Sequence, residues 1–188
     1  EGFVDLTELE KSIRPDTILV SCMYANNEIG TIEPIKKIAE IAHAHGVLCH
    51  TDAVQAMGAM RINVRDSGVD MMSFSAHKFN GPKGMGALFI KTGVPVGRLI
   101  SGGHQERTRR GGTTNVPGVV GFAEALRLTY ETLDEDVKHV AALRDRFVKR
   151  VLEEVPYVKF NGPKDMTKRL PNNADFSFEY IEGESILF

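Results

Sequence analysis

Several features that mark special classes of protein are scarce in this sequence of 188 residues. Cysteine occurs only at Cys22 and Cys49, which is too few for a disulfide scaffold and fits a reducing compartment such as the cytoplasm. Each lies in an apolar run, so we expect two inert core thiols. The formal net charge is only −2, which argues against a dedicated nucleic-acid surface or a polybasic membrane surface.

Signals that direct a chain to a membrane or mark its ends are also missing. No apolar run is long enough to cross a bilayer. The sequence begins with Glu1 and not with Met, and its acidic first residues do not resemble a signal peptide. The sequence stops at Phe188 without a closing signal, so we expect a piece of a longer protein. With 42% hydrophobic and 26% charged residues, the composition is that of a globular domain with a sizeable core.

What the sequence does contain is an alternation of strand-like and helical stretches. The strand-like runs are residues 17–23, 47–52, 70–75 and 86–90. The first is continuously apolar, which predicts a strand buried on both faces. Pro34 opens a helix that Gly46 closes, with an apolar stripe at Ile35, Ile38, Ala39, Ile41 and Ala42. The alternation predicts an α/β fold with a largely parallel sheet.

The last third of the chain is more polar. Residues 119–155 have a helical pattern that the acidic run 131–136 interrupts, so we predict two helices there. Residues 157–160 and 174–180 are candidate short strands. This shift predicts that residues 1–130 belong to one large domain and residues 131–188 to a smaller α+β domain.

Three polar clusters fall where the predicted strands end. They are Asn26-Asn27-Glu28, Asp52 with Gln55, and Ser75-Ala76-His77-Lys78. In an open α/β sheet, ligands bind at the carboxyl ends of the strands. We therefore expect these clusters to converge in space.

The residue types suggest specific chemistry at this edge. A lysine at a buried strand end, such as Lys78, can be partly desolvated, which lowers its pKa and makes its amine nucleophilic; the alternative is a solvated loop lysine. Asp52 could pair with the protonated ring nitrogen of a cofactor, or cap a following helix. Gln55 lies on the same side of that helix's first turn, or is a surface glutamine.

Other polar residues suggest an anion site rather than a metal site. Ser75 and His77 would face the same side in an extended backbone and could donate to one phosphate, although His77 could also be a structural histidine. The Gly- and Arg-rich loop 102–115 suits an anion, with nucleic acid as the competing interpretation. His43 and His45 are two residues apart and share no helix face, so we expect no metal site.

Taken together, five motifs resemble one family. The motifs are Asn-Asn-Glu-Ile-Gly (26–30), Asp-Ala-Val-Gln (52–55), Ser-Ala-His-Lys (75–78), Gly-Pro-Lys-Gly (81–84) and Arg-Arg-Gly-Gly-Thr (109–113). In this order the sequence resembles the NifS/IscS-type cysteine desulfurases, class V aminotransferase relatives with the type I fold of pyridoxal-phosphate (PLP) enzymes. Each motif is weak alone, but five in order are specific.

The resemblance implies a PLP cofactor and assigns a role to each residue. Lys78 would carry the cofactor and move the substrate proton, Asp52 would pair with the pyridinium nitrogen, and Gln55 would hydrogen-bond the phenolic oxygen. Ser75 and His77 would hold the phosphate.

Two further assignments concern the substrate and a second subunit. Asn27 would orient the cofactor and the substrate carboxylate. Thr113 matches a threonine that reaches the phosphate of a neighbouring subunit, which implies a homodimer.

The implied reaction is the conversion of L-cysteine to L-alanine, with the sulfur passed as a persulfide to a sulfur-acceptor or scaffold protein for iron–sulfur cluster assembly or tRNA thiolation. The family's ring-stacking histidine and sulfur-accepting cysteine have no match here, so we expect this piece to be inactive and to bind PLP weakly. Two alternatives are a selenocysteine lyase or other class V enzyme, and a non-catalytic scaffold-binding module.

Overall fold

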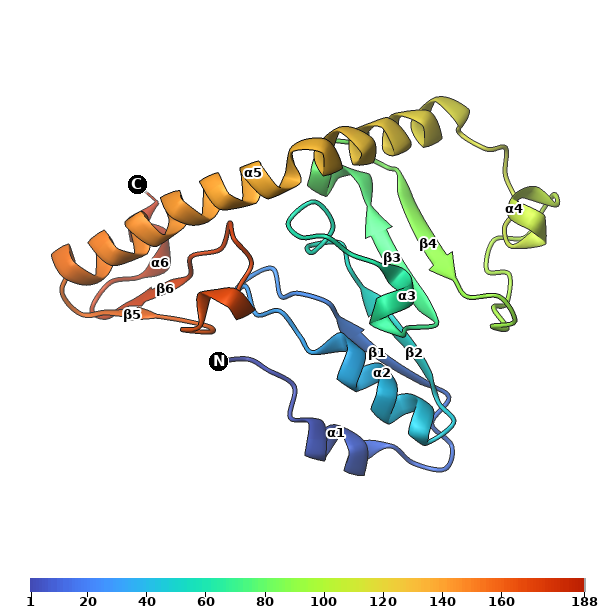
Figure 1. Cartoon of the computed structure of the whole chain (residues 1–188), viewed down its shortest axis with the longest axis horizontal. Coiled ribbons are helices and arrows are strands. Elements are labelled where there is room, and N and C mark those ends of the chain that lie inside the picture. The colour runs from blue at the N-terminus through green and yellow to red at the C-terminus, as the bar shows by residue number, and fades with distance from the viewer. Residues whose placement is uncertain (188) are drawn as a thin grey trace.

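Four strands form one sheet in the order in which they occur along the chain. They are β1 (Leu19–Met23), β2 (Leu48–Asp52), β3 (Met71–Ser75) and β4 (Gly86–Ile90). The first three pair in parallel, and β4 runs antiparallel to β3. The computed structural model, which describes residues 1–187, thus confirms an α/β fold with a mostly parallel sheet (Figure 1).

Helix α2 (Ile35–Ala44) covers one face of this sheet. Its predicted apolar stripe is confirmed, because Ile38 and Ala42 are fully buried and pack in one cluster with Cys49 and Met72. Helix α1 (Leu6–Ser12) lies beside α2, and the short helix α3 (Val64–Ser67) precedes β3. Burial of this stripe fixes the sheet on α2.

The opposite face of the sheet is more polar and more exposed. His50 contacts the hydroxyl of Ser21 at 2.8 Å through Nδ1 and that of Ser73 at 3.2 Å through Nε2. Leu19, on the edge strand β1, is 41% exposed. The prediction that this first strand is buried on both faces is wrong, because β1 is an edge strand and α2 covers only one face.

One long helix, α5 (Val116–Glu154), connects the sheet to the last part of the chain (Figure 1). The prediction of two helices divided at residues 131–136 is wrong. Acidic side chains do not by themselves end a helix, and α5 makes two tertiary contacts there. Leu133 is 2% exposed, and Asp134 forms a salt bridge of 2.9 Å with Arg61. The predicted domain boundary at residue 131 falls inside α5 and stays a prediction.

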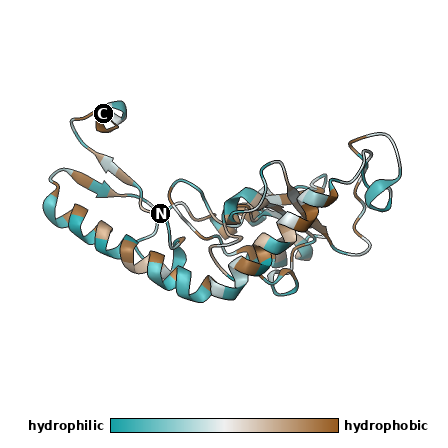
Figure 2. Cartoon of the chain, turned by 90° about the horizontal axis from the view of Figure 1, so that it is seen from above, coloured by the Kyte–Doolittle hydropathy of each residue, from teal (hydrophilic) through white to brown (hydrophobic). Residues whose placement is uncertain are grey.

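The two halves of α5 pack on different partners. Near its start, Phe122 lies edge-on to Phe79 with ring centroids 5.2 Å apart. Near its end, Phe147 packs on Phe176 of a two-stranded antiparallel sheet, at 5.9 Å. Polar and apolar residues are interspersed along α5 (Figure 2), and among the described residues no helix is both long and apolar enough to span a membrane.

The small sheet confirms the two short strands predicted near the end of the chain. The remaining elements are α4 (Gln105–Thr108), β5 (Val158–Phe160), a 3-10 helix (Met166–Lys168), β6 (Phe176–Phe178) and α6 (Gly183–Ile186).

Candidate functional site

The carboxyl ends of β1, β2 and β3 lie at the same edge of the sheet. Met23 is level with Asp52, and Asp52 is level with Ser73 in the strand register. Backbone hydrogen bonds continue past the strand ends, from Tyr24 N to the Asp52 carbonyl (2.7 Å) and from Ala53 N to the Ser73 carbonyl (3.0 Å). The three predicted polar clusters therefore follow neighbouring strands at one edge (Figure 1).

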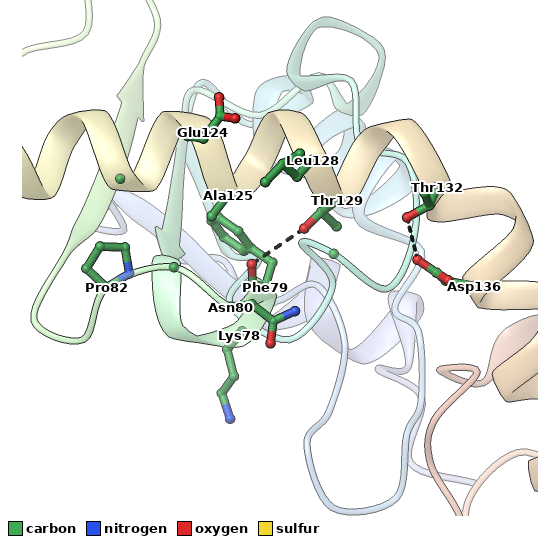
Figure 3. Close-up of a pocket in the computed structure, with 13 residues that line it drawn as sticks. Lys78, Phe79, Asn80, Pro82, Glu124, Ala125, Leu128, Thr129, Thr132 and Asp136 are labelled. Atoms are coloured by element: carbon green, nitrogen blue, oxygen red, sulfur yellow. Dashed lines mark hydrogen bonds between the residues drawn. The ribbon is translucent and has the colours of Figure 1, made fainter.

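Lys78 lies in a 3-10 helix, Ala76–Phe79, that begins directly after β3. Residues three apart eclipse in such a helix, and Ala76 and Phe79 are both buried while His77 and Lys78 are exposed. Of the two alternatives for Lys78 alone, the structure therefore supports the solvated lysine and not the partly desolvated one. In Figure 3 its side chain points away from α5. Its amine is therefore accessible to a ligand at this edge.

Asp52 is the last residue of β2, and Gln55 lies in the turn that follows it rather than in a helix. Oδ1 of Asp52 accepts a 2.9 Å hydrogen bond from Val54 N, and Met57 N bonds to the Ala53 carbonyl at 2.9 Å. Asp52 therefore caps a turn, as its alternative role suggested, although the helix that it was expected to cap does not form. Asp52 is exposed, and within the described part of the chain this is its one side-chain bond.

Gln55 and Lys78 border the same cavity, which has a volume of about 270 Å³. Its lining also includes Asp136 of α5 and Pro171-Asn172, which precede β6. A larger open groove of about 840 Å³ lies between the Lys78 segment and α5, where the Thr129 hydroxyl bonds to the Phe79 carbonyl at 3.4 Å (Figure 3).

Sequence reasoning did not identify Asp136, Pro171 or Asn172 as neighbours of this cavity. Asp136 belongs to the acidic run 131–136, for which the sequence predicts a break between helices. The Pro-Asn-Asn run at residues 171–173 was the available signal, because such residues favour turns that carry polar side chains.

Ser75 and His77 lie together, as predicted, although by a different geometry. Oγ of Ser75 is 2.7 Å from Nδ1 of His77. His77 belongs to the 3-10 helix and not to an extended segment, so the turn brings the two side chains together. The bond between them uses one of their two donors, so the pair can offer the other donor to an anion.

The two asparagines of the loop after β1 have different surroundings. Oδ1 of Asn26 accepts hydrogen bonds of 2.9 Å from the backbone N–H groups of Glu28 and Ile29. Asn26 thus folds the loop, whereas Asn27 is exposed. The geometry supports Asn27, and not Asn26, as the residue available to a ligand.

Thr113 is exposed in the loop before α5 and does not line either cavity that Lys78 borders. Its predicted contact with a second subunit stays a prediction. One arginine of the loop 102–115 bonds within the loop, since Arg110 donates to the Gly112 carbonyl at 2.9 Å. The anion-binding interpretation of this loop therefore does not rest on Arg110.

The two cysteines have raised pKa values. Burial is the main cause, and it raises the pKa of Cys22 to about 11 and that of Cys49 to about 12. The raised pKa values favour the neutral thiol at both positions, as expected for cysteines that are not nucleophiles.

The residues at this edge fit the cofactor that the resemblance implies. PLP offers an aldehyde, a ring nitrogen, a phenolic oxygen and a phosphate. The edge supplies an exposed amine (Lys78), an exposed carboxylate (Asp52), an amide (Gln55) and a paired hydroxyl and imidazole (Ser75 and His77). Each chemical group of the cofactor has a partner of suitable type.

Comparison with known proteins gives one consistent family. The model of the aminotransferase class-V family matches residues 1–188. Cysteine desulfurase IscS of Clostridium botulinum (strain Hall) is 51% identical over 187 residues, which is 100% of this chain and 47% of that protein. The IscS of Methanosarcina thermophila is 50% identical, over 99% of this chain and 45% of that protein.

Solved structures agree in fold. A NifS-like protein superposes with a TM-score of 0.92 at 43% identity, covering 98% of this chain and 50% of that one. DndA from Streptomyces lividans superposes with a TM-score of 0.85 at 32% identity, covering 99% of this chain and 52% of that one. The chain therefore spans about half the length of the proteins it matches.

Proposed function

This chain belongs to the class-V aminotransferase family, and from that premise we propose that it forms part of a PLP-dependent cysteine desulfurase. The reaction converts L-cysteine and an enzyme thiol to L-alanine and an enzyme persulfide. Relatives with 50–51% sequence identity are named cysteine desulfurases. This favours a cysteine desulfurase over a selenocysteine lyase.

The observation that carries the proposal is the position of one amine. Lys78 is exposed directly after the strand β3 and borders one cavity together with Gln55. A scaffold-binding module would have no chemical need for an exposed lysine and an exposed carboxylate, Asp52, at the same edge of the sheet.

The residues of this chain would divide the work as follows. Nζ of Lys78 would bind the aldehyde carbon of PLP and, once released, move the proton from Cα of the substrate. Asp52 would hold a proton on the ring nitrogen, and Gln55 would donate a hydrogen bond to the phenolic oxygen. When bound, PLP supplies the electron sink for the charge that develops at Cα.

Phosphate and substrate would be held by other side chains of the same edge. Ser75 and His77 would bind the phosphate, and Asn27 would orient the substrate carboxylate. Thr113 would reach the phosphate of a second subunit in a cytoplasmic homodimer. Because the raised pKa values of Cys22 and Cys49 favour the neutral thiol, the thiol that accepts the sulfur would be a different cysteine, and the persulfide would pass to an acceptor or scaffold protein.

The test is to supply the complete enzyme with PLP and a reductant, and to measure L-alanine formation together with sulfide release from L-cysteine and selenide release from L-selenocysteine. We expect turnover of L-cysteine that Lys78→Ala abolishes. Preference for L-selenocysteine would point to the lyase. A complete protein that bound no PLP, and in which Lys78→Ala changed nothing, would contradict the enzyme and favour the binding module.

A further inference from the structure

We infer that Asn173, oriented by Arg169, is a positioning residue that holds the loop of Asn27 in place at the edge of the site. This inference rests on the proposed function. It gives a role to the segment around Asn173, which the structure places beside the loop around Glu28, 145 positions earlier.

Several hydrogen bonds join the two segments, and all lie within one short stretch. Nδ2 of Asn173 donates to the Glu28 carbonyl at 2.6 Å. Leu170 N donates to the Gly30 carbonyl at 2.8 Å, and Thr31 pairs with Arg169 in an isolated antiparallel bridge. In Figure 1 the segment between β5 and β6 accordingly lies against the loop that follows β1.

Arg169 decides which way the amide of Asn173 faces. Its guanidinium is buried, with the whole residue 2% exposed, and lies 4.0 Å from the Phe160 ring centroid. It donates to Oδ1 of Asn173 at 2.5 Å and to the Pro163 carbonyl at 3.1 Å. Because a guanidinium can only donate, it fixes the amide oxygen toward itself and leaves the NH₂ group facing Glu28.

The fit between the two segments leaves no room for adjustment. A Cβ on Gly30, which has a φ of +75°, would lie 2.5 Å from Cγ of Asn173. A Cβ on Gly162 would lie 2.2 Å from the Ile29 carbonyl oxygen. Displacement of either segment would therefore displace the other.

The residues on both sides of Asn27 are fixed by hydrogen bonds. On one side Asn26 accepts the N–H groups of Glu28 and Ile29. On the other side Asn173 holds the Glu28 carbonyl. The same segment reaches the cavity itself, since Asn172 lines it together with Lys78. Asn173 thus fixes the backbone that presents Asn27.

The experiment compares Asn173→Ala with Asn161→Ala in the complete, PLP-loaded enzyme. The Asn161 side chain bonds to Asp175 and Ser177, and within residues 1–187 it forms no hydrogen bond with the loop. Its backbone carbonyl, which accepts from Arg169, is kept in the variant. We expect Asn173→Ala to lower kcat/KM for L-cysteine about 10- to 100-fold, mainly through KM, because a small displacement of a binding group has effects of this size. Asn161→Ala should leave kcat/KM near the wild-type value.

Two further arms separate positioning from general stability. Amide hydrogen exchange at residues 28–32 should accelerate in Asn173→Ala and not in Asn161→Ala. In an Asn27→Ala background, Asn173→Ala should cause little further loss, because it acts through Asn27. Asn173→Asp, which keeps the acceptor for Arg169 but has no N–H, should behave like Asn173→Ala and guards against misfolding of the latter.

Independent, additive losses from the two substitutions would overturn the inference, as would unchanged exchange at residues 28–32. A wild-type enzyme that bound PLP but did not turn over L-cysteine would instead overturn the proposed function. The exchange measurement would still decide whether Asn173 holds the loop.

Discussion

The hydroxyl oxygen of Ser75 lies 2.7 Å from Nδ1 of His77, across the junction where β3 becomes a 3-10 helix. The buried residue between them, Ala76, turns the chain so that both polar side chains emerge on one side. Lys78 follows immediately and is exposed. This junction therefore places a hydrogen-bonding pair that can bind an anion next to an amine.

Ser75→Ala should weaken binding of PLP to the complete enzyme roughly 10- to 100-fold, the effect of losing one hydrogen bond to a charged group. The dissociation constant is measured by absorbance titration. Ser73→Ala is the control, since Ser73 lies two residues earlier on β3 and contacts His50 instead. Equal affinity of the Ser75 and Ser73 variants would contradict a phosphate-binding role for Ser75.

Asp52→Asn separates the charge of Asp52 from its role in the turn. An asparagine can still accept the hydrogen bond from Val54 N, so stability to urea should change little. Activity should fall about 100-fold or more, because the variant has no charge to keep a proton on the ring nitrogen. The two measurements are steady-state kinetics and urea unfolding. A fall in stability that matched the loss of activity would indicate a structural role only.

Gly30→Ala should lower the free energy of unfolding by more than the 1–3 kcal/mol or so typical of a side chain forced into a left-handed conformation. The added Cβ also meets Asn173 at 2.5 Å. Gly46→Ala is the matched control, since Gly46 has a φ of +70° and open space around its Cβ position. Chemical denaturation measures both variants, and similar losses would show that contact with Asn173 adds nothing.

Asp70→Asn tests a buried carboxylate beneath the sheet. Asp70 is 4% exposed, and it accepts bonds from Cys49 N at 2.9 Å and from His43 at 2.7 Å, with Lys91 at 3.7 Å. Burial alone would raise the pKa of Asp70, but these partners together lower it below its usual value. The substitution should cost about 1–3 kcal/mol at neutral pH.

The pH dependence of that effect has a defined sign. Because the pKa of Asp70 is lower in the folded state, its contribution to stability is present above the unfolded pKa and is lost as pH falls through the folded value. The destabilisation by Asp70→Asn should therefore shrink below about pH 4. Asp16→Asn, in an exposed ion pair, should have little effect at any pH. A difference between wild type and Asp70→Asn that grew on acidification would contradict this account.

Local patterns in the sequence predicted the elements that form the edge of the site. The stripe of α2 follows from the helical period, and the strands follow from apolar runs between turn residues. Ser75, His77 and Lys78 were identified because polar residues directly follow a strand, and strand ends are where ligands bind.

What could not be predicted depends on contacts between distant segments. The continuity of α5 through residues 131–136 is supported by the burial of Leu133, to which the exposed ion pair of Asp134 with Arg61, 73 positions earlier, adds little. The exposure of Lys78 depends on which residues of a 3-10 turn face the core. Likewise, Asn173 reaches Glu28 only after the chain has folded back on itself.

The central claim is that the amine of Lys78 holds the cofactor, and covalent trapping tests it most directly. The complete enzyme is mixed with PLP, reduced with borohydride, digested and mapped by mass spectrometry. We predict a visible absorbance band that the reduction abolishes, with the trapped cofactor on Lys78 in the wild type and in Lys83→Ala, and on no residue in Lys78→Ala. Trapping on a different lysine, or equal trapping in Lys78→Ala, would contradict the claim.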